Sequence, residues 1–412
     1  MHYVPAIIIG AGQAGLAMSH CLGRRRIDHI VLERGQIGER WRSERWDTLR
    51  LLTPNWMSRL PGWSYHGDDP DGFMTAPEFV GYLEAYAAAS CAPVQARATV
   101  ISVRPSSHGY RVETSRGVWE ARAVVIATGH CDVPRVPALA QRLPRWIHQI
   151  SPSEYRNPAQ LRDGAVLVVG ASATGVQLAA EIRRSGRTVA ISVGSHTRLP
   201  RSYRGRDTWC WLEQTGLLDE TTAEVSDLLR ARAQPSFQLV GGPDGHTLDL
   251  GTLRDMGVRI VGRTTSVVGT TLCLRDDLAE TTGAAQAALE RLLGRIDIVA
   301  DGSGAPPAAD AACVLDLGSS PTALDLRTEG IRTVLWATGY GRNYSWLKVP
   351  VLDETGEVLH DGGITQSPGL YVLGLNFLRR RRSHFIDGVG LDAEDLAQHI
   401  DCYVSRSHRV AA

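Results

Sequence analysis

A glycine-rich turn occurs twice in this chain, each time between an apolar strand and a helix, and it decides more of the fold than any other feature. The first turn is Gly10-Ala11-Gly12-Gln13-Ala14-Gly15, and the second is Gly170-Ala171-Ser172-Ala173-Thr174-Gly175. In such a unit the first glycine permits the tight turn, the second position brings backbone amides near a pyrophosphate, and the third lets helix and strand pack closely. The sequence therefore predicts two dinucleotide-binding β-α-β units.

The strands that follow the two turns predict different dinucleotides. The first of them ends at Glu33, whose carboxylate can accept hydrogen bonds from both ribose hydroxyls and would repel a 2′-phosphate. The first site is therefore predicted to bind FAD or NAD. The second strand ends without a carboxylate, and Ser192, Arg198 and Arg201 supply hydroxyl and guanidinium groups that suit a 2′-phosphate. The second site is therefore predicted to bind NADPH.

The chain is long enough for two domains, because 412 residues exceed the size at which a single hydrophobic core usually stops growing. We predict an α/β protein in which residues 1–160 and 334–412 form one Rossmann-like domain, and residues 161–333 form a second one inserted into it. The expected strands of the first domain lie at 100–103, 110–113, 118–121, 123–127, 334–337 and 370–373, followed by a helix from residue 392. In the second domain, helices are expected at 222–233 and 278–293, and a loop at 302–312.

Composition and charge favour small molecules as partners. The formal net charge is zero, so nothing draws the chain to nucleic acid or to an anionic membrane. No apolar stretch is long enough to span a bilayer, and the opening strand leaves no room for a signal peptide, so a cytoplasmic location is expected. The seven cysteines include no Cys-x-x-Cys pair, which argues against a redox dithiol, a zinc site or another metal centre. Lys348 is the only lysine, a usage typical of a GC-rich bacterial genome.

Further motifs resemble the class B flavin-dependent monooxygenases, a family with two dinucleotide-binding domains that includes the flavin-containing monooxygenases and the YUCCA-like enzymes. The segments that carry the resemblance are Gly38-Glu39-Arg40-Trp41, residues 46–54 and 79–87, Ala127-Thr128-Gly129, Ala337-Thr338-Gly339-Tyr340, and residues 369–374. Together with the glycine turns they span most of the chain, roughly residues 5 to 400. The resemblance implies a glutathione-reductase-like architecture in which an FAD domain carries an inserted NADP domain, with FAD and NADPH as cofactors.

The resemblance also implies which residues surround the cofactors. Contacts to FAD are implied for Gln13, Ala14, Arg34, Arg40, Trp41, Leu52, Val100, Ala127, Thr128, Gly129 and Gly388, and contacts to NADPH for Ser172, Ala173, Thr174, Thr338 and Gly339. Around the isoalloxazine ring it places Asp47, Thr53, Asn55, Asn376 and His384, each as a catalytic or a structural hydrogen-bonding residue. The run Arg379 to Arg382 is either a solvated loop or a site for an anionic substrate.

The activity implied by the resemblance is monooxygenation of a small organic substrate. NADPH would reduce the flavin, O2 would add at C4a, and one oxygen atom would pass to an amine, a sulfide or a carbonyl group. One departure weakens this inference: the family fingerprint Phe-x-Gly-x-x-x-His-x-x-x-Tyr retains Tyr155, whereas Arg145, Ile147 and Ser151 occupy its other fixed positions. An NADPH-dependent oxidase that releases hydrogen peroxide is therefore the alternative. The oligomeric state stays open, and a homo-oligomer is compatible with the sequence.

Overall fold

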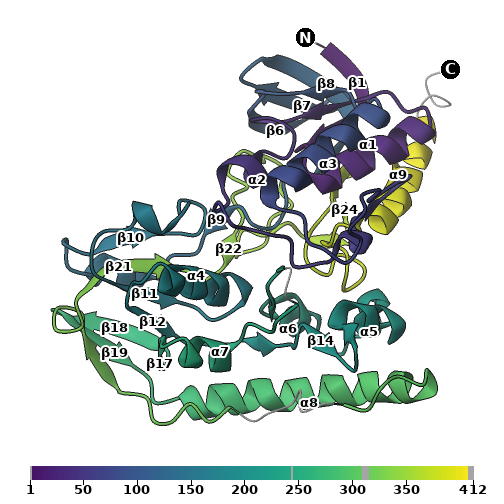
Figure 1. The fold of residues 1–412 in the computed structure, drawn as a ribbon. Coiled ribbons are helices and arrows are strands. Elements are labelled where there is room, and N and C mark those ends of the chain that lie inside the picture. Colours follow the sequence, from purple (N-terminus) through teal and green to yellow (C-terminus); the bar gives the residue numbers. More distant parts are fainter. Residues whose placement is uncertain (1, 243–244, 309–314, 407–412) are drawn as a thin grey trace.

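Two sheets, one in each lobe of the molecule, organise the chain (Figure 1). The computed structural model describes residues 2–242, 245–308 and 315–406. The first sheet has nine strands. Its main path runs in the order β23 (His360–Asp361), β24 (Ile364–Thr365), β25 (Leu370–Val372), β8 (Gly117–Ile126), β1 (His2–Ile9), β2 (His29–Leu32) and β5 (Val94–Gln95). The antiparallel strands β6 (Val100–Ser106) and β7 (Gly109–Thr114) extend it from β8.

The first predicted β-α-β unit is confirmed. Strand β1 leads into α1 (Gln13–Arg24), and β2 returns parallel to β1, with Ile9 paired to Leu32. Every residue of the segment 6–9 is buried, as expected for a central parallel strand covered on both faces. The predicted strands at 118–121 and 123–127 are one continuous strand, β8, because β1 pairs with it from Trp119 to Ile126, while β7 pairs with its early residues and β25 with its later ones.

The second β-α-β unit is also confirmed, in a five-stranded parallel sheet. The order of this sheet is β10 (His148–Ile150), β21 (Ile331–Trp336), β11 (Ala165–Val169), β12 (Val189–Ser192) and β17 (Arg259–Val261), and α4 (Ala173–Arg184) connects β11 to β12. The prediction that strand 334–337 rejoins the first domain is wrong. Strand β21 pairs with both β10 and β11, because its buried apolar side chains fill the second core.

These pairings bear on the proposed division into domains. The second sheet includes β10, which precedes residue 161, and β21, which crosses residue 333. We propose that the inserted domain extends at both ends, from about the start of β10 to the end of β21. The late strand β25 joins the first sheet beside β8, as predicted.

The region between β12 and β17 differs most from the prediction. Only α6 (Leu228–Arg232) is helical within the expected helix 222–233. The region also holds α5 (Thr208–Gln214), the short strands β13 (Thr197–Arg198), β14 (Ser202–Tyr203), β15 (Arg206–Asp207) and β16 (Phe237–Gln238), and α7 (Leu250–Asp255). Backbone bonds made to the first domain replace helical ones here, as when Thr222 N donates to the carbonyl of Arg379.

The later part of the second domain is longer and more regular than expected. Helix α8 (Leu278–Gly302) runs along the outer edge of the lower lobe and extends past the predicted end at 293 (Figure 1). Its last residue, Gly302, is the first residue of the expected loop at 302–312, and residues 309–312 of that loop lie outside the described residues. Strands β18 (Thr264–Val268), β19 (Thr271–Leu274) and β20 (Ala323–Asp325) form a small antiparallel sheet.

Helices cover the first sheet and complete its core. Helix α3 (Ala76–Ala89) begins with a capping box, in which Thr75 and Glu78 bond reciprocally. Helix α9 (Val389–Arg406) starts before the predicted residue 392 and packs on α1, and the short helix α2 (Glu39–Ser43) follows the first β-α-β unit. Within the described ranges, none of the helices combines the length and apolar character needed to cross a membrane.

Packing at the third glycine of the first turn yields a stability prediction. A Cβ at Gly15 would lie 1.8 Å from the carbonyl oxygen of Gly10, which is backbone and cannot move aside. Gly15→Ala should therefore lower the melting temperature by an amount equivalent to about 1–3 kcal/mol. Gly23→Ala on the same helix is the matched control, because nothing lies within 4 Å of its added Cβ and it should stabilise the helix slightly. Equal melting temperatures for the two variants would contradict this packing.

Candidate dinucleotide sites

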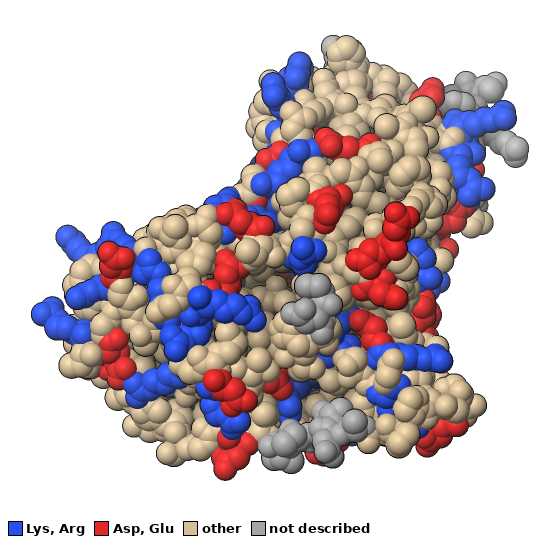
Figure 2. Space-filling model, viewed as in Figure 1, with Lys and Arg blue, Asp and Glu red and all other residues tan. Residues whose placement is uncertain are grey.

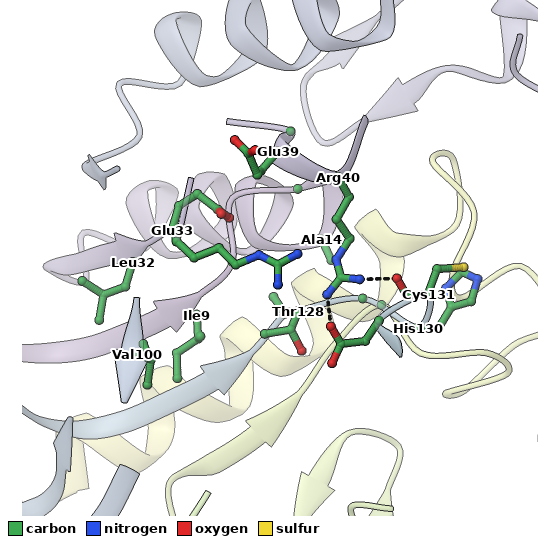
Figure 3. Close-up of a pocket in the computed structure, with 18 of the residues that line it drawn as sticks. Ile9, Ala14, Leu32, Glu33, Glu39, Arg40, Val100, Thr128, His130 and Cys131 are labelled. Carbon is green, nitrogen blue, oxygen red and sulfur yellow. Dashed lines mark hydrogen bonds and ion pairs between the residues drawn. The ribbon is translucent and has the colours of Figure 1, made fainter. Parts of the chain in front are cut away.

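A cavity of about 430 Å³ opens at the carboxyl ends of β1 and β2, in front of the amino end of α1 (Figure 3). The predicted FAD residues that line it are Gly10, Gly12, Gln13, Ala14, Glu33, Arg34, Arg40, Trp41, Val100, Ala127, Thr128 and Gly129. Predicted residues outside its lining are Gly15, Leu52 and Gly388. The structure thus brings most of the first predicted set to one cavity.

The glycines of the first turn shape the cavity in different ways. Gly10 has a φ of +109°, and a Cβ there would lie 2.6 Å from the carbonyl oxygen of Ala127. At Gly12 nothing lies within 4 Å of an added Cβ, so the backbone faces open space. That open space meets the amino end of α1, where free backbone amides and the helix dipole favour a diphosphate. The residues present therefore fit a dinucleotide.

Glu33 is held in place before any ligand binds. Its two carboxylate oxygens accept hydrogen bonds from the amides of Ala11, at 2.8 Å, and Gly35, at 2.9 Å. The residue is 7% exposed and lines the cavity. Because a carboxylate has about four acceptor positions, capacity remains for the hydroxyls of a ribose.

Arg40 closes one side of the same cavity. Its guanidinium forms an ion pair with Asp132 and donates to the carbonyl of Cys131, as the dashed lines in Figure 3 show. Next to it, the pKa of the Cys131 thiol is lowered to about 7: burial opposes this shift, and the neighbouring His130 and the guanidinium groups of Arg45 and Arg40 outweigh it. His130 and Cys131 both line the cavity, so a thiol with a lowered pKa lies in its wall.

Two of the predicted catalytic residues carry buried polar atoms that lack a hydrogen-bond partner among the described residues. These atoms are Nδ1 of His384 and Oδ1 of Asn376. The ring of His384 lies 5.1 Å from that of His130, measured between centroids, and burial lowers the pKa of His384 well below its ordinary value. Phe377, next to Asn376, has a φ of +47°, a conformation that costs energy for a bulky residue and concentrates at functional sites. Orphaned atoms of this kind fit a polar ligand such as a flavin ring.

The other predicted catalytic residues carry no orphaned buried atom of this kind. Asn55 is 4% exposed and bonds to the Asp69 carbonyl and the Met74 amide, so it shapes its own loop. The carboxylate of Asp47 accepts a hydrogen bond from Asn157, which links the first domain to the second. Thr53 is half-buried. A catalytic role for Asn55 is therefore disfavoured, because both ends of its amide are used within the fold.

The second glycine turn repeats the geometry of the first. Gly170 also has a φ of +109°, and a Cβ there would lie 2.3 Å from the carbonyl oxygen of Ala337. A Cβ at Gly175 would lie 1.9 Å from the carbonyl oxygen of Gly170. Ser172, Ala173 and Thr174 stand at the amino end of α4, and Thr338 and Gly339 follow Ala337 where the chain returns toward the first domain.

Ser192, Arg198 and Arg201, which the sequence predicts to receive the 2′-phosphate, are all buried and bonded to protein partners in this structure. Ser192 is 2% exposed, and its hydroxyl bonds to Gly262 and Thr264. Arg198 is 7% exposed and pairs with Asp249 at 2.8 Å, and Arg201 is 2% exposed and pairs with Asp207. Buried guanidinium groups require such carboxylate partners. The sequence did not indicate these pairs, because Asp249 is far from Arg198 along the chain and Asp207 lies on the turn that adjoins Arg201.

A different arginine lies where the 2′-phosphate was expected. The guanidinium of Arg263 lies about 3.7 Å from the position of a Cβ on Gly194, just beyond the end of β12. It donates to the Ser195 hydroxyl at 3.3 Å and lies 3.4 Å from the carboxylate of Asp277. The Arg263 side chain is 44% exposed and therefore accessible to a ligand. Sequence reasoning missed it because Arg263 follows the next strand of the sheet, β17.

The four consecutive arginines form a lock at the contact between the domains, in which the side chains of Arg381 and Arg382 reach the second domain and those of Arg379 and Arg380 pair within the first. Arg381 pairs with Glu220, Arg382 pairs with Asp219 and Asp387, and Arg379 and Arg380 pair with Asp395 and Asp392 of α9. Backbone bonds reinforce them, because the amides of Arg381 and Arg382 donate to the carbonyls of Glu220 and Leu218. Neither the solvated loop nor the anion site considered from the sequence describes this arrangement.

The cavity also has lining residues that were not predicted. They are Ile9, Leu32, Gly38, Glu39, Arg45, Ala98, Thr99, His130, Cys131, Asp132, Val133, Asn343, Trp346 and Gly374. Gly374, two residues after β25, lies in the segment 369–374 that carries the family resemblance, and its φ of +78° and close approach to Ala14 explain the glycine. Asn343 and Trp346 come from the segment after β21, which sequence spacing could not place.

Comparison with known proteins places the chain in a family. Residues 7–208 match the sequence model of the pyridine nucleotide-disulphide oxidoreductases. A CzcO-like oxidoreductase of Geobacillus kaustophilus is 33% identical over 403 residues, which cover 97% of this chain and 99% of that protein. The rice indole-3-pyruvate monooxygenase YUCCA4 is 28% identical over 98% of this chain and 88% of its own length. The chain belongs to the class B flavin monooxygenase family.

Structural similarity agrees with this family. A flavin-containing monooxygenase from Stenotrophomonas maltophilia has a TM-score of 0.68 at 20% identity, with 98% of this chain and 99% of that chain covered. The fold is accordingly a pair of Rossmann-like domains of the glutathione-reductase type, as predicted. As a member of this family the protein is an oxidoreductase, and we propose FAD and NADPH as its cofactors.

The open space in front of Gly12 yields a binding prediction. Gly12→Val should fold, because nothing in the protein lies within 4 Å of the added Cβ, yet it should lose FAD, because the new side chain occupies the approach of the pyrophosphate. Flavin content per protein after purification, together with the melting temperature, measures both effects. A folded Gly12→Val protein that keeps stoichiometric FAD would disprove the assignment of this cavity.

Proposed function

We propose that the protein is an NADPH-consuming monooxygenase that transfers one oxygen atom from O2 to a small organic substrate. The observation that carries the proposal is the pair of equivalent glycine turns, one facing an open cavity that fits FAD and one at the edge of a separate parallel sheet. The FAD supplies the redox chemistry with O2, and the protein supplies binding, orientation and exclusion of water. Family membership supports oxygen transfer, and it leaves the substrate and the type of oxygenation to experiment.

Roles for this chain's own residues follow from the cavity. Glu33 would orient the ribose of FAD, the amide-rich turn at Gly12 would bind its diphosphate, and Arg40 would close the cavity over it. His384 stays neutral at pH 7, because burial lowers its pKa, and its orphaned Nδ1 is free to exchange a hydrogen bond with the flavin. The half-buried Asn376 offers a second polar atom of the same kind.

The principal alternative is an oxidase that reduces O2 to hydrogen peroxide without oxygen transfer. The observation in its favour is the missing fingerprint histidine, since Ser151 is buried and its hydroxyl bonds locally to Glu154 at 2.6 Å. Tyr155, the retained fingerprint residue, donates to Glu181 on α4. The linker is thus fixed to the second domain, and nothing in these bonds reaches the cavity of the first.

Measuring peroxide yield separates the two functions. The FAD-loaded protein would be supplied with NADPH and air, with and without methyl phenyl sulfide or trimethylamine as probe substrates. A monooxygenase should form less peroxide per NADPH oxidised when a probe is accepted, and label from ¹⁸O2 should appear in the oxidised probe. A peroxide yield that stays near one per NADPH with every probe, without labelled product, would favour the oxidase.

The position of Arg263 yields a prediction about coenzyme choice. We propose that Arg263, with Ser195, contacts the 2′-phosphate of NADPH, so Arg263→Ala should raise the KM for NADPH roughly tenfold and leave the KM for NADH nearly unchanged. Arg259→Ala is the matched control, because Arg259 is equally exposed on β17 and pairs with Glu329 instead. Equal losses with both coenzymes, or the same loss in the control, would refute this contact.

A further inference from the structure

A single backbone carbonyl of the first domain is held by two side chains of the second. The carbonyl oxygen of Leu52 accepts a hydrogen bond from Nη1 of Arg201, at 2.8 Å, and another from Nε1 of Trp209, at 3.0 Å. Both donors are almost fully buried, with Arg201 2% and Trp209 3% exposed. Two fixed donors on one acceptor leave the carbonyl little freedom to move.

Asp207 organises both donors. One carboxylate oxygen pairs with the guanidinium of Arg201, and the other accepts the backbone amide of Trp209, at 2.8 Å, where it caps the start of α5. The guanidinium also lies 4.7 Å from the ring centre of Phe73, in a cation–π contact with the first domain. Burial lowers the pKa of Arg201 from its very high ordinary value, and the pairing with Asp207 opposes that shift.

A series of aromatic contacts leads from the clamp to the wall of the cavity. The ring of Trp209 packs edge-on against Phe385, with centroids 5.3 Å apart, and Phe385 packs against His384 at 4.6 Å. His384 in turn contacts His130 in the cavity wall. The segment 237–241 also packs against the clamped loop, because a Cβ at Gly241 would lie 2.1 Å from the carbonyl oxygen of Leu51.

We propose that Arg201 and Trp209 are positioning residues for the reaction: they clamp the Leu52 carbonyl and so fix the loop 51–54 at the contact between the two domains, from which a series of aromatic rings leads to the His130 end of the cavity. The inference rests on the proposed function, since it assumes that the redox chemistry occurs at this end. Electron transfer between two bound cofactors requires a fixed approach of one to the other, and a loop tied to both domains provides it.

The test compares Arg201→Lys, Trp209→Phe and the double variant with Arg198→Lys. Lysine retains a charge for Asp207 but lacks the forked guanidinium that also reaches Leu52, and phenylalanine retains the packing of an aromatic ring without its donor. Arg198 is the matched control, because it is a buried arginine that pairs with Asp249 and Gln286 of its own domain. Thermal unfolding identifies any variant whose stability has collapsed.

The decisive readout is amide hydrogen exchange of residues 51–57 in the FAD-loaded proteins without turnover. The amides of Leu51 and Asn55 are bonded to Met74 and Gly72, so a released loop exposes them. In the double variant we expect exchange there to rise about tenfold and kcat for NADPH oxidation to fall with little change in the KM for NADPH. The control should show neither effect.

Exchange that is unchanged in the double variant, or that rises equally in Arg198→Lys, would overturn the proposal. Trp209→Phe keeps the test decisive if the Arg201 variants do not fold, because it removes one donor and preserves the packing. The result of the exchange measurements does not depend on the proposed function, because they are made without turnover. A wild-type protein that transfers no oxygen would refute monooxygenation, whereas the exchange measurements would still show whether the clamp holds the loop.

Discussion

The architecture depends on a close contact between backbones that is made once in each domain. The first glycine of each turn lies against the carbonyl of an alanine in an Ala-Thr-Gly segment, Ala127 in one domain and Ala337 in the other. No side chain fits at either contact, because a Cβ would lie within 2.6 Å of the carbonyl oxygen. Each contact joins the start of a dinucleotide turn to the end of a neighbouring strand, and the cavity before Gly12 exists because of that junction.

Sequence patterns predicted the features that depend on local backbone geometry. The two β-α-β units, the acidic end of β2 and the part of the cavity lining next to the first glycine turn could be read from the sequence because glycine positions and strand ends determine them. The side-chain partners of Arg198 and Arg201 could not, because their burial depends on how the region 199–240 folds across the interface. The same limit explains the missed helix ends in that region and the wrong sheet for β21, which depend on long-range pairing.

The interface between the domains is a packed structure of its own. A hydrophobic cluster joins Met57 of the first domain to residues of α5 and α8, including Trp211 and Ile296. The arginine lock at 379–382 and the pair formed by Arg59 and Glu213 surround it with ion pairs. Such an interface resembles a domain core more than the polar contacts that permit free hinge motion. On the face shown in Figure 2, the charges of both signs are interspersed, in keeping with zero net charge.

The clamp on loop 51–54 binds a main-chain atom, the carbonyl oxygen of Leu52. The contacts that hold the loop are therefore separate from the side chains that the loop carries. Every residue type at position 52 supplies the same carbonyl, so side chains can vary there without loss of the anchor, provided that the backbone conformation is kept. The constraint falls instead on positions 201, 207 and 209, which would have to change together. In evolution or in engineering, the surface of the loop could therefore diversify toward new substrates while its position was inherited unchanged.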